Sequence, residues 1–166
     1  MLSLNRSSTF IIHARKAWLK GLSPKENRDV PPLRYDIVQR IKKAHPHLNI
    51  ILNGGIKTLE DISEHLLHFD GVMIGREAYH NPWILSEIEN NIFDTETPSR
   101  EDIVHAMQDY TNLLVSENNI HSHSITRHMM GLFKAQRGGK IWRQSLSVPS
   151  DSKNILLDAL EQTIQS

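Results

Sequence analysis

"ILNGGIKTLEDI", residues 51–62, decides the fold, because an apolar run passes through two glycines into a helical pattern. The run at residues 48–53 has no polar alternation, which predicts a parallel strand buried on both faces. Thr58 and Asp61 have the spacing of a capping box and predict a helix that begins at this point. The apolar residues that follow at helical spacing are Leu59, Ile62, Leu66 and Leu67.

The same alternation of strand and helix extends to both sides of this stretch. Residues 8–14, "STFIIHA", and residues 70–75, "DGVMIG", predict two more strands, and residues 35–45 predict a helix between the first two. Apolar strands separated by helices are typical of βα units in a parallel sheet. Three strands are too few to close a barrel, so we expect a sheet that is incomplete or is completed by another chain.

The second half of the sequence has a helical pattern. Ser99 and Asp102 again have capping-box spacing, and apolar residues follow at steps of three and four. Further helices are expected over residues 125–134 and 154–164. We therefore predict an α/β domain at residues 1–92 and a small all-helical bundle at residues 93–166.

Composition excludes several classes of protein. The 166 residues carry a formal net charge of zero and contain no cysteine, which excludes disulfides, thiolate metal sites and a cysteine catalyst within this chain. No apolar run is long enough to cross a bilayer, and the N-terminus lacks an apolar signal core, so a cytoplasmic protein without membrane contact is expected. His121, His123 and His128 lie close together without carboxylates, and we expect no metal site there.

Glycines follow two of the predicted strands at matched positions. Asn53-Gly54-Gly55 ends the second strand, and Gly75-Arg76 follows the third. Glycine lets a backbone approach a ligand closely, and the loops after the last two strands of a (β/α)8 barrel form a recurrent phosphate site. The pair therefore favours a phosphate site, and two ordinary turns with a surface arginine are the alternative.

Other candidate residues surround this glycine pair in the sequence. His13 closes the first strand, where a neutral imidazole could donate to a phosphate, a flavin or a base oxygen. The loop that follows it is long, polar and marked by prolines, which is typical of functional loops, and Lys25 and Arg28 are its candidates for phosphate contact. A further basic cluster includes Lys140 and Arg143.

Several stretches together resemble one known family. "FIIHARKAWLKGLSPKENRDVPPLRY", "NGGI", "DGVMIGREAYHNPWIL", "ITRHMMGLF" and "WRQSL" are similar to the C-terminal half of tRNA-dihydrouridine synthases of the A subfamily, from residue 8 to about residue 160. The resemblance implies the last part of a TIM barrel followed by a helical tRNA-binding domain. It also implies an enzyme in which NADPH reduces FMN and the flavin passes a hydride to a D-loop uridine, of the 20/20a class.

The resemblance also assigns roles to residues of this chain. The cofactor-binding residues that it implies are His13, Asn53, Gly54, Gly55, Gly75 and Arg76. The tRNA-binding residues that it implies are Arg15, Lys25, Arg28, Lys140 and Arg143. It implies no catalytic residue here, because the family's acid is a cysteine on an earlier barrel strand and this sequence has none.

We therefore expect the chain to be a C-terminal portion that is inactive alone, with a separate N-terminal half chain as a possible partner. One alternative is a non-catalytic tRNA-binding remnant. Another is a different FMN-dependent TIM-barrel oxidoreductase, of the dihydroorotate dehydrogenase kind. RNA binding requires the basic residues to align, whereas an enzyme for small molecules has no use for them.

Overall fold

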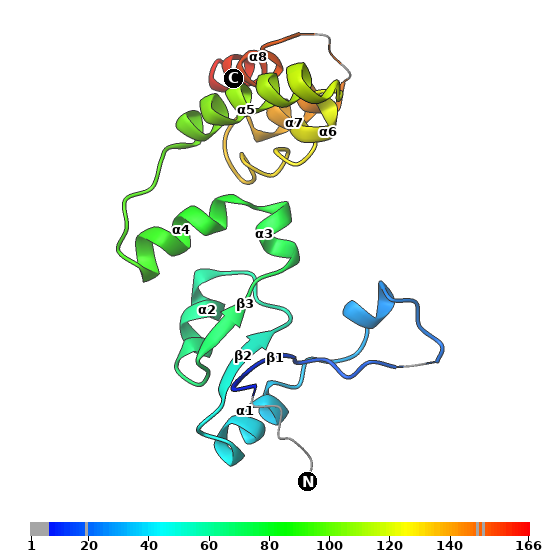
Figure 1. Cartoon of the computed structure of the whole chain (residues 1–166), viewed down its shortest axis with the longest axis vertical. Coiled ribbons are helices and arrows are strands. Elements are labelled where there is room, and N and C mark those ends of the chain that lie inside the picture. Colours follow the sequence, from blue (N-terminus) through cyan, green and yellow to red (C-terminus); the bar gives the residue numbers. More distant parts are fainter. Residues whose placement is uncertain (1–6, 19, 149, 151) are drawn as a thin grey trace. The chain divides into compact units, whose positions relative to one another are not determined.

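The computed structural model describes residues 7–18, 20–148, 150 and 152–166, with the side chain of Arg28 left out. The chain divides into two compact units, of which the first ends at Gly75 and the second begins at Arg76 (Figure 1). Within the described residues, no helix combines the length and the apolar character that crossing a membrane would require. The domain boundary at residue 92 that the sequence suggested stays a prediction.

The first unit is a small parallel sheet with helices in its connections. Its elements are β1 (Thr9–His13), the short 3-10 helix η1 (Glu26–Arg28), α1 (Tyr35–Ala44), β2 (Asn49–Asn53), α2 (Leu59–Leu66) and β3 (Gly71–Met73). The strands lie in the order β1-β2-β3, and both pairs are parallel. The predicted α/β class and the three βα strands are confirmed, and a barrel that these strands would help to close stays a prediction.

The two faces of the sheet differ in burial. Ile50 and Leu52 alternate along β2 and are almost fully buried, together with Val38 of α1 and Ile62 of α2. In β1, by contrast, Ile11 is 59% exposed. The prediction that the strands are buried on both faces is therefore wrong for the described chain. An apolar run indicates which residues can be covered, but it does not supply the layer that covers them.

Reciprocal side-chain caps begin the two helices for which the sequence predicted them. The Asp61 backbone N–H donates to the Thr58 hydroxyl over 3.1 Å, and the Thr58 N–H donates to the Asp61 carboxylate over 3.1 Å. Ser99 and Asp102 exchange the same pair of bonds before α5 (Arg100–Asn118). Each cap satisfies N–H groups that the helix itself leaves unpaired. Both predicted capping boxes are confirmed.

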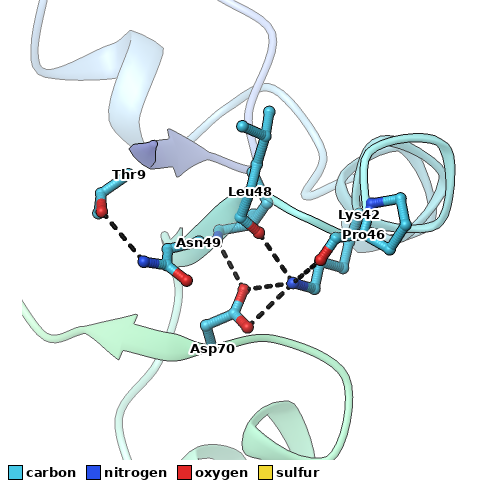
Figure 2. A network of polar contacts seen from close by, with 7 residues as sticks. Thr9, Lys42, Pro46, Leu48, Asn49 and Asp70 are labelled. Carbon is cyan, nitrogen blue, oxygen red and sulfur yellow. Dashed lines mark hydrogen bonds and ion pairs between the residues drawn. The ribbon is translucent and has the colours of Figure 1, made fainter. Parts of the chain in front are cut away.

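A polar network around Lys42 fixes the approach to β2 (Figure 2). The Lys42 ammonium donates to the Pro46 and Leu48 carbonyls over 3.2 and 2.8 Å, and it forms an ion pair with Asp70 at 2.7 Å. The Asp70 carboxylate also accepts the Ile50 backbone N–H over 2.7 Å. This one carboxylate therefore connects α1, β2 and the start of β3.

The second unit is helical. Its elements are α3 (Arg76–His80), α4 (Trp83–Ile92), α5, α6 (His123–Thr126), α7 (Gly139–Ser147) and α8 (Ile155–Ile164). The core is built around Trp142, which is fully buried, donates from its indole N–H to the Met129 carbonyl over 2.9 Å and packs on Phe133. Gln108 is buried too, and its amide joins α5 to α8 by accepting the Leu156 N–H over 2.8 Å.

The helix expected over residues 125–134 is wrong. Only α6 is helical there, and the chain continues to residue 138 in successive turns. In these turns the Met129, Leu132 and Lys134 N–H groups donate to carbonyls three residues earlier. The turns direct Met129, Leu132 and Phe133 into the core around Trp142, and this tertiary packing overrides the local helical pattern.

The first unit should lose stability in acid through Asp70. The Lys42 hydrogen bond, first, and the Ile50 N–H hold the pKa of the Asp70 carboxyl below its ordinary value. Its contribution is therefore complete above the ordinary aspartate pKa, about 4, and is lost as the pH falls through the lower folded value. In urea unfolding, we expect the unaltered chain to lose more stability between about pH 5 and pH 3 than Asp70→Asn.

Asp109→Asn, which changes an exposed carboxylate on α5, is the matched control and should follow the unaltered chain. An identical acid loss in Asp70→Asn and the unaltered chain would contradict this role of the carboxylate.

Candidate functional site

Three strand ends lie side by side at the carboxyl edge of the sheet. His13 of β1 pairs with Asn53 of β2, and Asn53 pairs with Met73 of β3. Because the pairing is parallel and in register, the loops that follow these residues leave the sheet at one edge. The structure thus brings together His13, the Asn-Gly-Gly loop and the approach to Gly75, as the sequence predicted.

The two glycines after β2 are required by their backbone conformation and by close packing. Gly54 and Gly55 have φ values of +114° and +80°, which side chains rarely allow. A β-carbon on Gly55 would lie 2.4 Å from the Leu33 side chain and 2.7 Å from the Tyr35 hydroxyl. That hydroxyl donates to the Gly54 carbonyl over 2.8 Å and holds the turn. The turn alone therefore explains why glycine is needed.

Leu33 and Tyr35 are supporting residues that the sequence reasoning did not single out. Burial, first, and the nearby Asp61 carboxylate raise the pKa of the Tyr35 hydroxyl, which stays a neutral donor to Gly54. The signal was the position of both residues inside the "PPLRY" stretch, but their contact with a loop about 20 residues later is a tertiary feature.

The imidazole of His13 is oriented by the backbone that follows it. The Arg15 backbone N–H donates to His13 Nδ1 over 3.2 Å. An accepting Nδ1 assigns the proton of the neutral ring to Nε2, which makes Nε2 a hydrogen-bond donor. The carbon between the two nitrogens also lies 3.0 Å from the position of a β-carbon on Gly54. His13 and the Asn-Gly-Gly loop are therefore direct neighbours.

Gly75 differs from the glycines after β2. Its φ is outside the positive range, and a β-carbon there would meet no described heavy atom within 4 Å. Neither backbone strain nor packing within the described residues explains a glycine at this position. Arg76 follows it directly and begins α3, in the second unit.

Arg15 has a clear role within the first unit. Its guanidinium donates to the Asp29 carbonyl over 2.9 Å and also to the Pro31 carbonyl, and so it closes the long loop after β1. Lys25 lies exposed at the start of η1 in this loop. The side chain of Arg28 lies outside the described part of the structure. RNA contacts by these three residues stay predictions.

Lys140 and Arg143 lie three residues apart on α7, and both are exposed. Residues at this spacing project from one helix face. Trp142, which lies between them in the sequence, is buried in the core and anchors that face. The structure thus places the predicted basic pair on one rigid surface. In the part of the chain that is described, no three His, Asp or Glu side chains are grouped to hold a metal ion.

The sequence of the chain matches a known family over nearly its whole length. The family model for dihydrouridine synthase matches residues 7–166, and the chain therefore belongs to the dihydrouridine synthase family. It is 48% identical over 157 residues to a tRNA-dihydrouridine(20/20a) synthase of Vibrio cholerae, covering 93% of this chain and 48% of the relative. Proteins with the same name from Salmonella typhimurium and Escherichia coli (strain K12) are 48% and 46% identical, each over 94% of this chain and 47% and 46% of the relative.

The chain spans about half the length of the curated relatives that it matches.

Replacing each glycine in turn should separate the strained turn from the open position. We expect Gly55→Ala to lower the free energy of unfolding by about 1–3 kcal/mol, because alanine at this φ is strained and its methyl group would displace Leu33 or the Tyr35 hydroxyl. Gly75→Ala should change it by less than about 0.5 kcal/mol. Urea denaturation of the two variants tests this, and equal effects would contradict the assigned geometry.

Proposed function

We propose that the chain is the C-terminal portion of a tRNA-dihydrouridine synthase, in which FMN, reduced by NADPH, reduces a D-loop uridine of the 20/20a class. The observation that carries the proposal is the parallel register that places His13 and the Asn-Gly-Gly loop beside the end of β3. The names of the relatives supply the substrate class. The shared family favours this function over an enzyme of the dihydroorotate dehydrogenase kind.

The loop after β2 fits the phosphate of FMN. Among the described residues, the Gly54 and Gly55 N–H groups donate no hydrogen bond to a protein acceptor. Two successive N–H groups at positive φ form the kind of concave donor pair that binds anions. A glycine at position 75, which no described contact requires, leaves room for a ligand to approach the backbone there.

Each residue at this edge would then have a distinct task. The loop N–H groups would hold the phosphate, and the Arg76 guanidinium would add positive charge beside it. His13 Nε2–H would donate to an acceptor on the flavin or the base. FMN supplies the hydride when it is bound, and the protein residues named here bind and orient the reactants.

Protonation of the base requires an acid that this sequence does not contain as a cysteine. We propose that the chain has no synthase activity alone and that a separate N-terminal half chain would have to provide the acid. The absence of cysteine also keeps a second function open, that of a non-catalytic tRNA-binding remnant acting in the cytoplasm.

On the RNA side, we propose that residues 93–166 form the tRNA-binding domain, with Lys140 and Arg143 in contact with phosphates. Lys25, Arg28 and Arg15 would contribute from the loop after β1. Lysine and arginine on a rigid helix face bind the RNA backbone by charge, without reading its sequence.

The purified chain should be colourless. A phosphate loop alone contacts one end of FMN, so that binding should be too weak to survive purification. Visible absorbance near 450 nm after purification tests this. A stoichiometric yellow flavin would show that the chain encloses the isoalloxazine ring by itself and would contradict the need for a second half chain.

tRNA binding by the chain should depend on the basic pair of α7. We expect Lys140→Ala with Arg143→Ala to weaken binding and to lower the slope of log affinity against log salt by roughly 2, because two phosphate contacts are lost. Filter binding of an unmodified tRNA transcript at several salt concentrations measures both quantities.

Lys43→Ala with Lys57→Ala is the matched control, because it also removes two exposed positive charges. If both double variants reduce affinity and slope equally, the effect is one of net charge, and the assigned contacts are wrong.

A further inference from the structure

Tyr79 on α3 presents a large part of its ring to solvent. The side chain is 55% exposed although it takes part in an ordered cluster. The His80 ring lies 5.4 Å away and the His128 ring 5.7 Å away, centroid to centroid, at interplanar angles of 75° and 71°. Arg127 precedes His128 in the chain, and we call these four residues the Tyr79 cluster.

A chain of hydrogen bonds fixes the orientation of this ring. The Arg127 Nε–H donates to His128 Nε2 over 3.2 Å, which assigns the proton of the neutral imidazole to Nδ1. Nδ1 lies 2.9 Å from the Tyr79 hydroxyl and therefore donates to it. The Tyr79 hydroxyl accepts this bond, and its own proton can be donated to a ligand. An aromatic ring that is already ordered loses little conformational entropy when it binds.

Other contacts already attach α3 to the segment that carries His128. Lys134 and Glu77 form an ion pair at 2.7 Å. The backbone at Gly131 approaches α3 so closely that a β-carbon there would lie 2.5 Å from the His80 carbonyl oxygen. Attachment of α3 therefore does not depend on the Tyr79 ring, and its exposed apolar surface is not explained by packing.

The chemistry of the cluster suits RNA. An exposed aromatic ring provides a stacking surface for any base, and an adjacent guanidinium attracts phosphate or adds cation–π attraction. The Glu77 carboxylate on the same helix is paired with Lys134, so its negative charge is balanced. The cluster thus combines a fixed ring with positive charge, as in surfaces that bind unpaired nucleotides.

We propose that the Tyr79 cluster is a stacking platform for an unpaired base of the bound RNA, with Arg127 contacting an adjacent phosphate. This inference rests on the proposed function and adds a contact in the second unit that is separate from the basic pair on α7.

Crosslinking and substitution together test the platform. A tRNA transcript containing 5-iodouridine, irradiated with the full chain, should crosslink to Tyr79 or His80, as located by mass spectrometry of the peptides. Tyr79→Ala should weaken tRNA binding by roughly 5- to 100-fold, the range that loss of one stacked base gives. It should leave the salt slope unchanged, because no charge is removed, whereas Arg127→Ala should lower that slope by roughly 1.

Tyr110→Ala is the matched control, since Tyr110 is 49% exposed on α5 of the same unit. Its affinity should stay within about twofold of the unaltered chain, and Tyr79→Phe, which keeps the ring, should retain most of the binding. Thermal unfolding of each variant separates loss of binding from loss of fold.

Unchanged affinity in Tyr79→Ala, with crosslinks elsewhere, overturns the platform. The proposed function survives that result if the double variant on α7 still reduces binding. A chain that binds no tRNA at all overturns both.

Discussion

Parallel pairing in register between β1, β2 and β3 is the constraint on which the candidate site depends. It sets His13, Asn53 and Met73 in one row, so that three loops leave the sheet at the same edge. A shift of one residue would turn the side chains of a strand to the opposite face and move the loops apart. Lys42 and Asp70 support this register by joining the backbone before β2 to the residue before β3.

The Asn-Gly-Gly stretch then serves two purposes at one place. On one side, Leu33 and Tyr35 leave no room for side chains at the glycines and hold the turn closed. The N–H groups of the same glycines donate to no described protein acceptor, and we propose that they bind the FMN phosphate. A turn and an anion site are therefore compatible explanations of the same two residues. Gly75 is the better indicator of a ligand, because no described packing contact requires glycine there.

Sequence reasoning succeeded where a signal is local. The capping boxes at Thr58 and Ser99 and the three strands follow from residues that are neighbours in the chain. It failed where distant residues decide. Ile11 is exposed because nothing described covers that face, and residues 125–134 form turns because the core around Trp142 needs them. The contacts of Arg15 with loop carbonyls and of Tyr35 with Gly54 could not be read from spacing alone.

Amide NMR of the chain titrated with FMN, compared with riboflavin, tests the central proposal most directly, because the two ligands differ only in the phosphate. The account predicts weak binding of FMN, with the largest shifts at the amides of Gly54, Gly55, Gly75 and Arg76 and no comparable shifts with riboflavin. Equal shifts with both ligands, or FMN-dependent shifts confined to other parts of the chain, would show that this edge of the sheet does not bind the phosphate.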